Sequence, residues 1–187
     1  MTKKGLVSGI ASLGAPTRGS FFRAVPLVYI HTPLSAIGSL TNGGRYNPIG
    51  AFEVFYAAQE RDTVPRETRA IIVDPASGAT ISISQPPAIY LTINVVMQLA
   101  VDLTDSAVCT ALAIKPNDLL VEWRDLVALK KRVPTHTIGR AALLAGVEAL
   151  IVPSARLVGT KNIAILVENL KIGSSPQIVR ASVGFAG

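Results

Sequence analysis

The chain has 187 residues, with 18 lysines and arginines against 12 aspartates and glutamates, which gives a formal net charge of +6. Hydrophobic residues make up 49% and charged residues 16%, which excludes an intrinsically disordered chain, because such chains are poor in apolar residues and rich in charge. No apolar run reaches the roughly 18 residues of a membrane-spanning helix, and the single cysteine, Cys109, excludes an internal disulfide. The length predicts one domain.

Residues 1–20 are expected to form an N-terminal extension that precedes a domain at residues 21–187. Lys3 and Lys4 precede a mildly apolar stretch, residues 5–15, which loosely resembles a secretory signal. Glycines and serines dilute this stretch. We therefore expect a cytoplasmic protein, with delivery into a target cell as the alternative.

A glycine-rich loop is expected between the first two strands. Residues 21–30 and 52–58 are rich in aromatic and β-branched residues, which predicts a strand in each. Residues 32–50 lie between them and carry the turn signals Asn42-Gly43-Gly44 and Asn47-Pro48. The sequence therefore predicts a strand, a loop and a second strand.

Helix signals follow the second strand. Asp62 or Thr63 can cap a helix that has Pro65 in its first turn, and this helix is expected to run to about Val73. Asp105 is expected to cap a short helix. Two longer helices are predicted at residues 119–131 and 137–146.

The remaining strands do not alternate regularly with these helices. They are predicted at residues 88–95, 98–103, 147–152, 162–168 and 178–183. Because no regular strand–helix–strand repeat appears, the sequence predicts an α+β fold rather than a doubly wound sheet. We expect a single compact domain with a mixed β core and flanking helices.

Several common catalytic and binding motifs are missing from the sequence. It has neither a G-x-G-x-x-G dinucleotide loop nor a phosphate-binding G-x-x-x-x-G-K-[ST] loop, and no serine lies in a G-x-S-x-G elbow. His31 and His136 lie far apart and match no metal-ligand spacing, so we expect no metal site. Cys109 lies in an apolar stretch and is interpreted as a buried structural residue.

One segment combines the parts of an anion-binding site. Gly43-Gly44 lets a backbone approach a ligand closely, and the adjacent Arg45 can grip a phosphate or carboxylate through two hydrogen bonds. Tyr56, near the end of the second strand, offers a flat face for stacking on a ring. Glu67 follows on the predicted helix and can return to the same cleft. These residues predict a site for an anionic, aromatic ligand on which positive charge develops.

The segment Gly43-Gly44-Arg45-Tyr46-Asn47, followed by Tyr56 and Glu67, resembles the RES domain, a family named for its Arg, Glu and Ser. Arg23, in the first predicted strand, stands where the family has its leading arginine. The resemblance covers roughly residues 21–170, which is most of the chain.

Later parts of the chain extend the resemblance. Thr137-Ile138-Gly139 and Val152-Pro153-Ser154-Ala155 resemble two further family motifs, and Asn162 resembles a downstream asparagine. Two departures exist. The family often has Trp where Tyr46 stands, which keeps an aromatic ring, and residues 30–40 lack the family's small Ser- and Gly-rich stretch.

The resemblance implies a bacterial toxin that acts on NAD. RES domains resemble the fold of ADP-ribosylating toxins, and their members hydrolyse NAD, split it with phosphate or transfer ADP-ribose to a protein. NAD is then the substrate and phosphate a co-substrate of one variant, and no metal or redox cofactor is needed. The implied partner is an antitoxin or immunity protein that covers the active-site cleft. A homo-oligomer is compatible with the sequence, whereas membrane or direct nucleic-acid binding is not expected.

The resemblance also implies roles for individual residues. Glu67 would stabilise the positive charge that develops on the ribose or orient the acceptor, because glycosyl cleavage passes through an oxocarbenium-like state. Arg23 and Arg45 would hold the pyrophosphate. Tyr56 would stack near the nicotinamide, and Ser154 would form a hydrogen bond on that side or position a partner group. The implied catalytic residues are Glu67, Arg45, Tyr56 and Ser154, and the implied NAD-binding residues are Arg23, Gly44, Arg45, Tyr46, Asn47, Tyr56 and Asn162.

Taken without the resemblance, these residues have plainer interpretations. Arg23 could form a buried salt bridge, Tyr56 could be a core aromatic and Ser154 a turn residue, and Trp123 is expected in the core with no role. The first alternative function is ADP-ribosylation of a macromolecule. A distant alternative is a basic nucleic-acid-binding module, which rests on the net charge and on Lys130-Lys131-Arg132.

Overall fold

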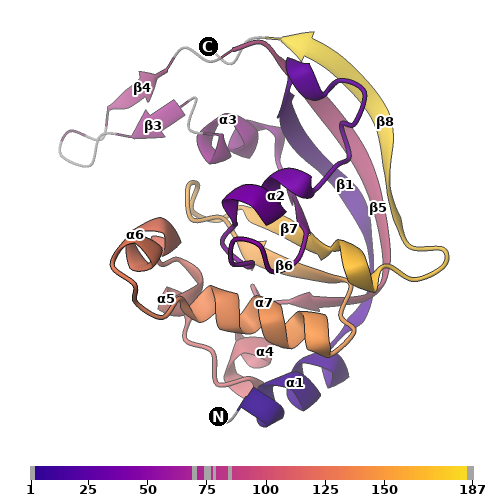
Figure 1. Cartoon of the computed structure of the whole chain (residues 1–187), viewed down its shortest axis with the longest axis vertical. Helices are drawn as coiled ribbons and strands as arrows, with labels where there is room; N and C mark the ends of the chain where they lie inside the picture. The colour runs from indigo at the N-terminus through magenta and orange to yellow at the C-terminus, as the bar shows by residue number, and fades with distance from the viewer. Residues whose placement is uncertain (1–2, 69–70, 74–76, 78, 84–85, 185–187) are drawn as a thin grey trace.

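Six strands form a mixed sheet that closes on itself (Figure 1). In the computed structural model, which describes every residue except 1–2, 69–70, 74–76, 78, 84–85 and 185–187, the strand order is β1-β2-β7-β6-β5-β8. β1 also pairs with β5, which closes five of these strands into a ring and leaves β8 outside it. The strands are β1 (Ala15–Pro26), β2 (Val54–Ala58), β5 (Ala88–Asp102), β6 (Ala149–Pro153), β7 (Lys161–Leu166) and β8 (Ser175–Gly184).

Strand β5 organises the sheet because it pairs with three other strands. It lies antiparallel to β1 and to β8, and its last residues, 100–102, lie parallel to β6. Alternate side chains such as Leu91 and Ile93 are buried, because successive residues of a strand point to opposite faces. The sequence predicted two strands here. The structure joins them, since Val96 and Met97 continue the pairing with β1.

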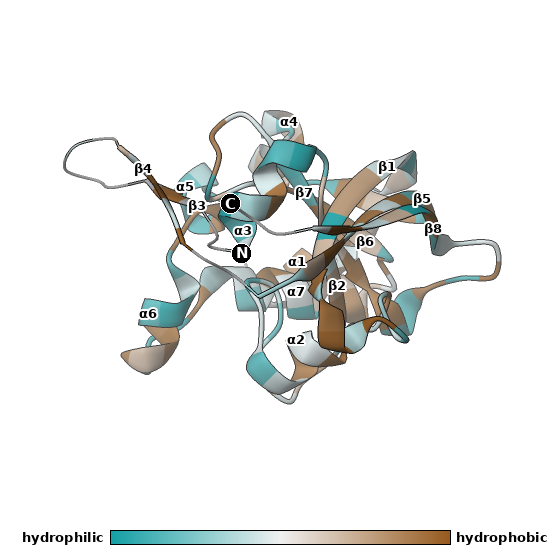
Figure 2. Cartoon of the chain, turned by 90° about the horizontal axis from the view of Figure 1, so that it is seen from above, coloured by the Kyte–Doolittle hydropathy of each residue, from teal (hydrophilic) through white to brown (hydrophobic). Residues whose placement is uncertain are grey.

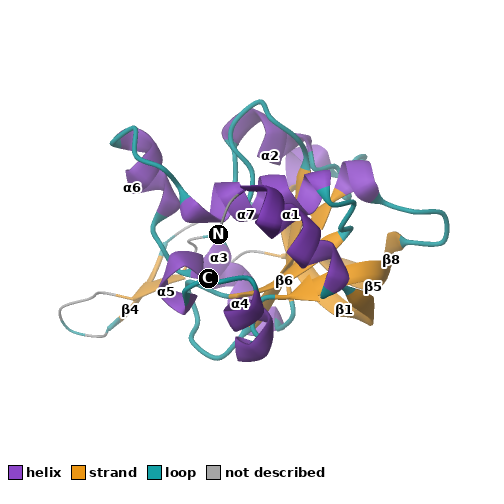
Figure 3. Cartoon of the chain, turned by 90° about the horizontal axis from the view of Figure 1, so that it is seen from below, coloured by secondary structure: helices purple, strands orange, loops and turns teal. Residues whose placement is uncertain are grey.

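The helices gather along one side of the closed sheet (Figure 3). Helix α1 packs near α7 and buries Leu6 and Ile10. None of the helices in the described ranges is both long and apolar enough to cross a membrane. The helices are α1 (Lys3–Ser12), α2 (Ile37–Asn42), α3 (Val64–Glu67), α4 (Ser106–Ala111), α5 (Pro116–Leu119), α6 (Trp123–Ala128) and α7 (Pro134–Leu144). Three short 3-10 helices, η1 (Leu27–Tyr29), η2 (Arg61–Thr63) and η3 (Val167–Asn169), and a hairpin of β3 (Ile71–Val73) and β4 (Thr80–Ser82) complete the described elements.

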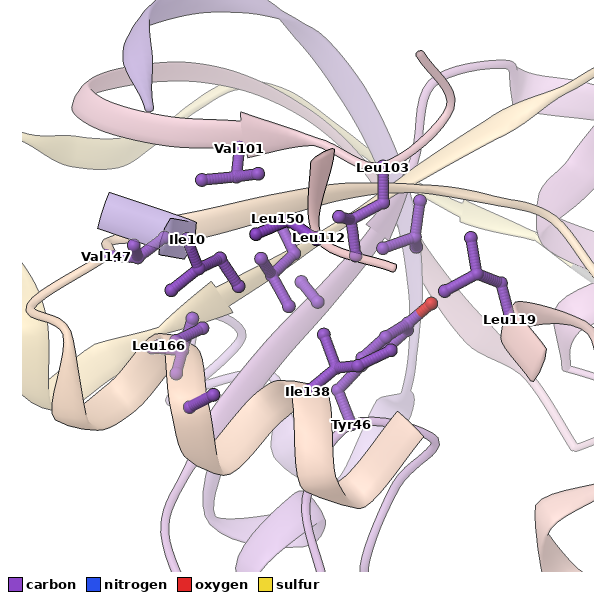
Figure 4. Packing of buried hydrophobic residues seen from close by; sticks show 14 of the residues in the cluster. Ile10, Tyr46, Val101, Leu103, Leu112, Leu119, Ile138, Val147, Leu150 and Leu166 are labelled. Atoms are coloured by element: carbon purple, nitrogen blue, oxygen red, sulfur yellow. The ribbon is translucent and has the colours of Figure 1, made fainter. Parts of the chain in front are cut away.

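The two faces of the sheet each bury a hydrophobic cluster. On one face, Ile10 and Ile138 of the helices pack with Leu150 and Tyr46 (Figure 4). The other cluster, which includes Ile163 of β7, fills the opposite face. Figure 2 shows hydrophobic residues along strands of this sheet such as β2. A sheet buried on both faces gives a rigid support for the residues at its edges.

The structure confirms a mixed α and β domain and several of its elements. Helix α7 and strands β2, β6, β7 and β8 lie where the sequence predicts them, within a few residues. Asp105 caps α4 as expected, because its Oδ1 accepts a hydrogen bond from the Ala107 backbone N–H at 2.7 Å. The likeness to ADP-ribosylating toxins stays a prediction.

Three predicted elements are wrong in extent. The helix expected to reach Val73 ends at Glu67, because the β-branched residues 71–73 pair with β4 instead. The first strand runs from Ala15 to Pro26 rather than over residues 21–30, and η1 follows it. The single helix predicted at 119–131 is divided into α5 and α6.

Candidate active site

The glycine-rich loop between α2 and β2 packs directly against Tyr56. Gly43 has a φ of 70°, a conformation that glycine adopts without strain. Gly44 leaves no room for a side chain, because a Cβ there would lie 2.5 Å from the Tyr56 hydroxyl oxygen and 2.6 Å from Asn47 Oδ1. The two glycines therefore have different functions: the first turns the chain and the second permits close contact with β2.

Tyr56 holds this loop through its hydroxyl group. The hydroxyl donates a hydrogen bond to Asn47 Oδ1 at 2.8 Å and accepts one from the Tyr46 backbone N–H at 2.9 Å. Burial raises the pKa of Tyr56, so the hydroxyl stays protonated. Asn47 is fully buried and donates through Nδ2 to the carbonyl oxygens of Ser39 and Phe52. Asn47 thus positions the loop and Tyr56 rather than facing the cleft.

Arg45 connects the loop to the segment between α5 and α6. Its Nη1 donates to the carbonyl oxygens of Leu119, at 3.4 Å, and Val121. His136, on α7, contacts the same loop, with its Nε2 2.9 Å from the Gly44 carbonyl oxygen. Burial lowers the pKa of His136, which favours the neutral ring with its proton on Nε2. The loop is therefore held from two further elements.

Arg23 is a largely buried arginine that forms no ion pair with any carboxylate that the structure describes. Its guanidinium lies 4.2 Å from the centre of the Phe55 ring, and Nη2 donates to the Ser35 carbonyl oxygen at 3.1 Å. Nη1 is buried and has no hydrogen-bond partner in the described part of the chain. Burial lowers the pKa of Arg23 to about 10, which still leaves it charged at neutral pH. A buried cation with a free donor favours an anionic ligand.

Glu67, at the end of α3, receives two side-chain hydrogen bonds on the same oxygen. Ser154 Oγ and Asn162 Nδ2 each donate to Glu67 Oε1, both at 2.7 Å. The Ser154 oxygen itself accepts from the backbone N–H groups of Arg156 and Leu157, each at 3.1 Å, so its proton must point to Glu67. Oε2 has no hydrogen-bond partner within the residues that the structure describes. The carboxylate is thus oriented through one oxygen and open at the other.

These parts surround a cleft with a volume of about 360 Å³. Ser154 and Asn47 do not line it, and support Glu67 and Tyr56 from behind. The Tyr46 side chain is only 1% exposed and its ring packs in the core (Figure 4). The implied residues that line the cleft are Arg23, Gly44, Arg45, Tyr46, Tyr56, Glu67 and Asn162.

The sequence prediction missed three residues of this cleft, two of them on α6. Trp123, expected only in the core, lines the cleft, and the Arg124 guanidinium lies 4.5 Å from the centre of its ring. Arg156 lines the cleft as well and forms an ion pair of 2.7 Å with Glu122. No local motif marks these residues. Trp123 and Arg124 join the site because a break in the predicted helix separates α6 from α5, whereas Arg156 lies in the segment after β6 and is held beside α6 by its ion pair with Glu122.

The charges around the cleft are strongly unbalanced. Glu67 is the one carboxylate among the lining residues that the structure describes. Guanidinium groups match the geometry of phosphate oxygens, so four of them around one cleft favour a ligand with more than one negative charge. The arginines that line the cleft are Arg23, Arg45, Arg124 and Arg156.

The chain belongs to the RES domain family, whose model matches residues 20–180. Among solved structures, it is similar to a chain of the crystal structure of the M. tuberculosis MbcT–MbcA toxin–antitoxin complex. That similarity has a TM-score of 0.75 at 21% sequence identity and covers 97% of this chain and 92% of the other, which establishes a shared fold. A search of curated proteins found no match.

Proposed function

We propose that the chain is a RES-family toxin that cleaves the bond between nicotinamide and ribose in NAD, with water or phosphate as the acceptor. The observation that carries this proposal is the open Oε2 of Glu67 beside a cleft with four arginines. Family membership and the fold shared with a chain of a toxin–antitoxin complex support it.

The arginines account for binding. The pyrophosphate of NAD carries two negative charges, and the free Nη1 of Arg23 supplies a buried donor for one of its oxygens. Arg45 uses Nη1 on backbone carbonyl groups, so its remaining N–H groups are those that can reach a ligand. The cleft volume of about 360 Å³ lies within the range of roughly 300–1,000 Å³ that small-molecule sites occupy.

Glu67 accounts for the chemistry. When the bond between ribose C1′ and the nicotinamide nitrogen breaks, the electron pair leaves with nicotinamide and positive charge develops on the ribose. A carboxylate oxygen placed beside C1′ stabilises that charge, and Oε2 is the oxygen free to do so. The acceptor oxygen of water or phosphate then bonds to C1′, and water loses a proton in the process. Ser154 and Asn162 hold the carboxylate in place while this occurs.

Asn162 offers a further contact for the substrate. Its Nδ2 is engaged with Glu67, whereas its Oδ1 is buried without a hydrogen-bond partner in the described ranges. An unpaired buried acceptor is costly, so we expect a donor of the bound ligand, such as an amide or hydroxyl group, to satisfy it.

A cognate inhibitor protein is part of the proposal, because a cell that makes an NAD-degrading toxin must block it. The rim of the cleft offers apolar surface for such a partner. Ile37, beside the cleft residues Gly38 and Ser39, is 49% exposed. We expect the inhibitor to cover this rim and the cleft.

The test is nicotinamide release from NAD by the purified protein, with and without phosphate. Release that requires phosphate identifies phosphorolysis, and release without it identifies hydrolysis. NAD labelled in its ADP-ribose part separates both from transfer to a macromolecule, which would retain the label. A folded protein that releases no nicotinamide under any of these conditions contradicts the proposal.

A further inference from the structure

A second, smaller groove adjoins the cleft on the other side of β1. It has a volume of about 60 Å³ and lies between η2 with α3 and the sheet formed by β1, β5 and β8. It shares Phe22, Arg23 and Val64 with the main cleft. The remaining residues around it are Arg61, Tyr90, Leu91, Thr92, Arg180 and Ser182.

Strand register explains why polar side chains converge here. Thr92 of β5 pairs with Arg180 of β8, and Tyr90 pairs with Ser182. Paired residues of neighbouring strands point to the same face, and so do residues two apart on one strand. These four side chains therefore project from one face of the sheet, toward η2 and Arg61. Arg23 pairs with Leu91, between Tyr90 and Thr92, so its side chain starts from the opposite face of the sheet, and its guanidinium stacks on Phe55.

Apart from Arg23, which the groove shares with the main cleft, the polar side chains of the groove have no hydrogen-bond or ion-pair partner among the described residues. Arg61 and Arg180 form no ion pair, and the hydroxyl groups of Tyr90, Thr92 and Ser182 form no hydrogen bond, within the part of the chain that the structure describes. No Asp or Glu appears among the groove residues. Two exposed arginines from separate elements, Arg61 of η2 and Arg180 of β8, thus line one small groove without a carboxylate among the residues around it.

We propose that this groove is a second anion-binding site, which holds one phosphoryl group between Arg61 and Arg180. An oxyanion between the two guanidinium groups replaces their repulsion by charge-assisted hydrogen bonds, and the hydroxyl groups of Tyr90, Thr92 and Ser182 supply further neutral donors.

The size of the groove limits the ligand. A cavity needs roughly 10–15 Å³ to hold a single water molecule. The groove, with about 60 Å³, therefore holds several heavy atoms but not a whole nucleotide. The phosphoryl group has two sources. It is either free inorganic phosphate or a phosphate of a nucleotide whose remainder extends into the main cleft past Phe22 and Val64. Phosphate binding does not depend on NAD cleavage, so this proposal is independent of the proposed function.

The experiment is a titration of the ¹⁵N-labelled protein with inorganic phosphate and, separately, with ADP, at constant ionic strength and followed by NMR. We expect saturable shifts of the backbone amides of Thr92, Arg180 and Ser182. In the variants Arg61→Ala and Arg180→Ala, the affinity should fall by about 10-fold or more, the effect of losing a hydrogen bond to a charged group. Arg18→Ala is the matched control, because Arg18 is an exposed arginine of β1 that lines neither cavity.

The two titrations, with inorganic phosphate and with ADP, distinguish the two sources of the phosphoryl group. Shifts caused by phosphate alone identify a site for the free ion, and shifts caused by ADP but not by phosphate identify a site for a nucleotide phosphate. Both results support the proposal if Arg61→Ala and Arg180→Ala weaken the binding that causes the shifts by about 10-fold or more and Arg18→Ala does not. Absence of shifts at these amides with both probes overturns it, and so do shifts that persist in the Arg61→Ala/Arg180→Ala double variant.

Discussion

Glu148 and Glu67 are both held by hydrogen bonds, but Glu148 accepts them on both carboxylate oxygens and Glu67 on one. Glu148 lies just before β6 and is fully buried. Its Oε2 accepts hydrogen bonds from the backbone N–H groups of Gln98, at 2.6 Å, and Leu99, at 2.7 Å. Its Oε1 accepts a hydrogen bond from the backbone N–H group of Lys171 at 2.9 Å. Both oxygens of this carboxylate are therefore used to connect β5, β6 and the segment before β8.

Glu67 is exposed and is held by side chains instead of backbone groups. Ser154 and Asn162 both donate to Oε1, and Oε2 is left open toward the arginine-lined cleft. The comparison separates two uses of one residue type. A carboxylate saturated on both oxygens contributes to folding, whereas one that is oriented through a single oxygen can stabilise charge on a ligand with the other.

The largest effect is expected from Glu67→Gln. This change keeps the size of the side chain and removes its negative charge, so kcat for nicotinamide release should fall by about 10²–10³. NAD affinity should change little, because the arginines bind the pyrophosphate. Steady-state kinetics and direct binding measurements check both parts, and thermal unfolding checks that the variant is folded. Near-normal turnover in a folded Glu67→Gln variant would contradict the role given to Glu67.

Glu148→Gln is expected to lower the stability of the protein and to leave its turnover unchanged. An amide cannot accept the same backbone hydrogen bonds at both positions, and at least one buried donor loses its partner. We expect a loss of about 2 kcal/mol in the free energy of unfolding, measured by denaturant titration. The kcat per folded molecule should stay unchanged. A variant that keeps its stability but loses turnover would contradict the division between the two carboxylates.

A smaller effect is expected from Ser154→Ala, which removes one of the two donors to Glu67 Oε1. The kcat should fall by about 10-fold, with KM nearly unchanged, because the carboxylate loses orientation but keeps its charge. Thr160→Ala is a matched control: Thr160 lies in the same segment, and its hydroxyl donates to the Leu157 carbonyl oxygen and accepts from the Thr63 hydroxyl but does not contact Glu67. If both variants lose turnover equally, Ser154 supports the local fold alone.

The smallest effect concerns pH. Burial alone would raise the pKa of Glu148, but the backbone hydrogen bonds hold it below its ordinary value. Its contribution to stability is then fully present above the unfolded pKa, which is roughly 4.3, and is lost as pH falls through the lower folded pKa. Unfolding measured between about pH 5 and pH 3 should show a steeper loss of stability for the wild type than for Glu148→Gln. Parallel curves would contradict this assignment.

The sequence predicted the parts of the site whose signal is local. The glycine-rich loop, Arg45 and Tyr56 lie within fourteen residues, from Gly43 to Tyr56, and the structure brings them together. Glu67 was predicted on a longer helix, yet it reaches the cleft because α3 ends there. Asn162 joins Glu67 through the pairing of β2 with β7, and the resemblance to the RES family already included it.

Trp123, Arg124 and Arg156 could not be predicted in this way. The places of Trp123 and Arg124 depend on the break between α5 and α6, which Arg45 stabilises from far along the chain by its hydrogen bonds to Leu119 and Val121. Arg156 follows β6 and is held near α6 by its ion pair with Glu122. Periodicity predicts where a helix can form, but a long-range hydrogen bond decides where it ends. The Ile71–Val73 strand shows the same limit, since its partner β4 overrides the helix signal.

The central claim is that the open oxygen of Glu67 performs the chemistry, whereas Glu148 performs a structural role. The most direct test compares nicotinamide release from NAD by wild type, Glu67→Gln and Glu148→Gln at equal concentrations of folded protein, in the presence of phosphate. We predict release by wild type and by Glu148→Gln at similar rates, and a rate about 10²–10³ lower for Glu67→Gln. Equal rates for wild type and Glu67→Gln, or no release by the folded wild type, would contradict the account.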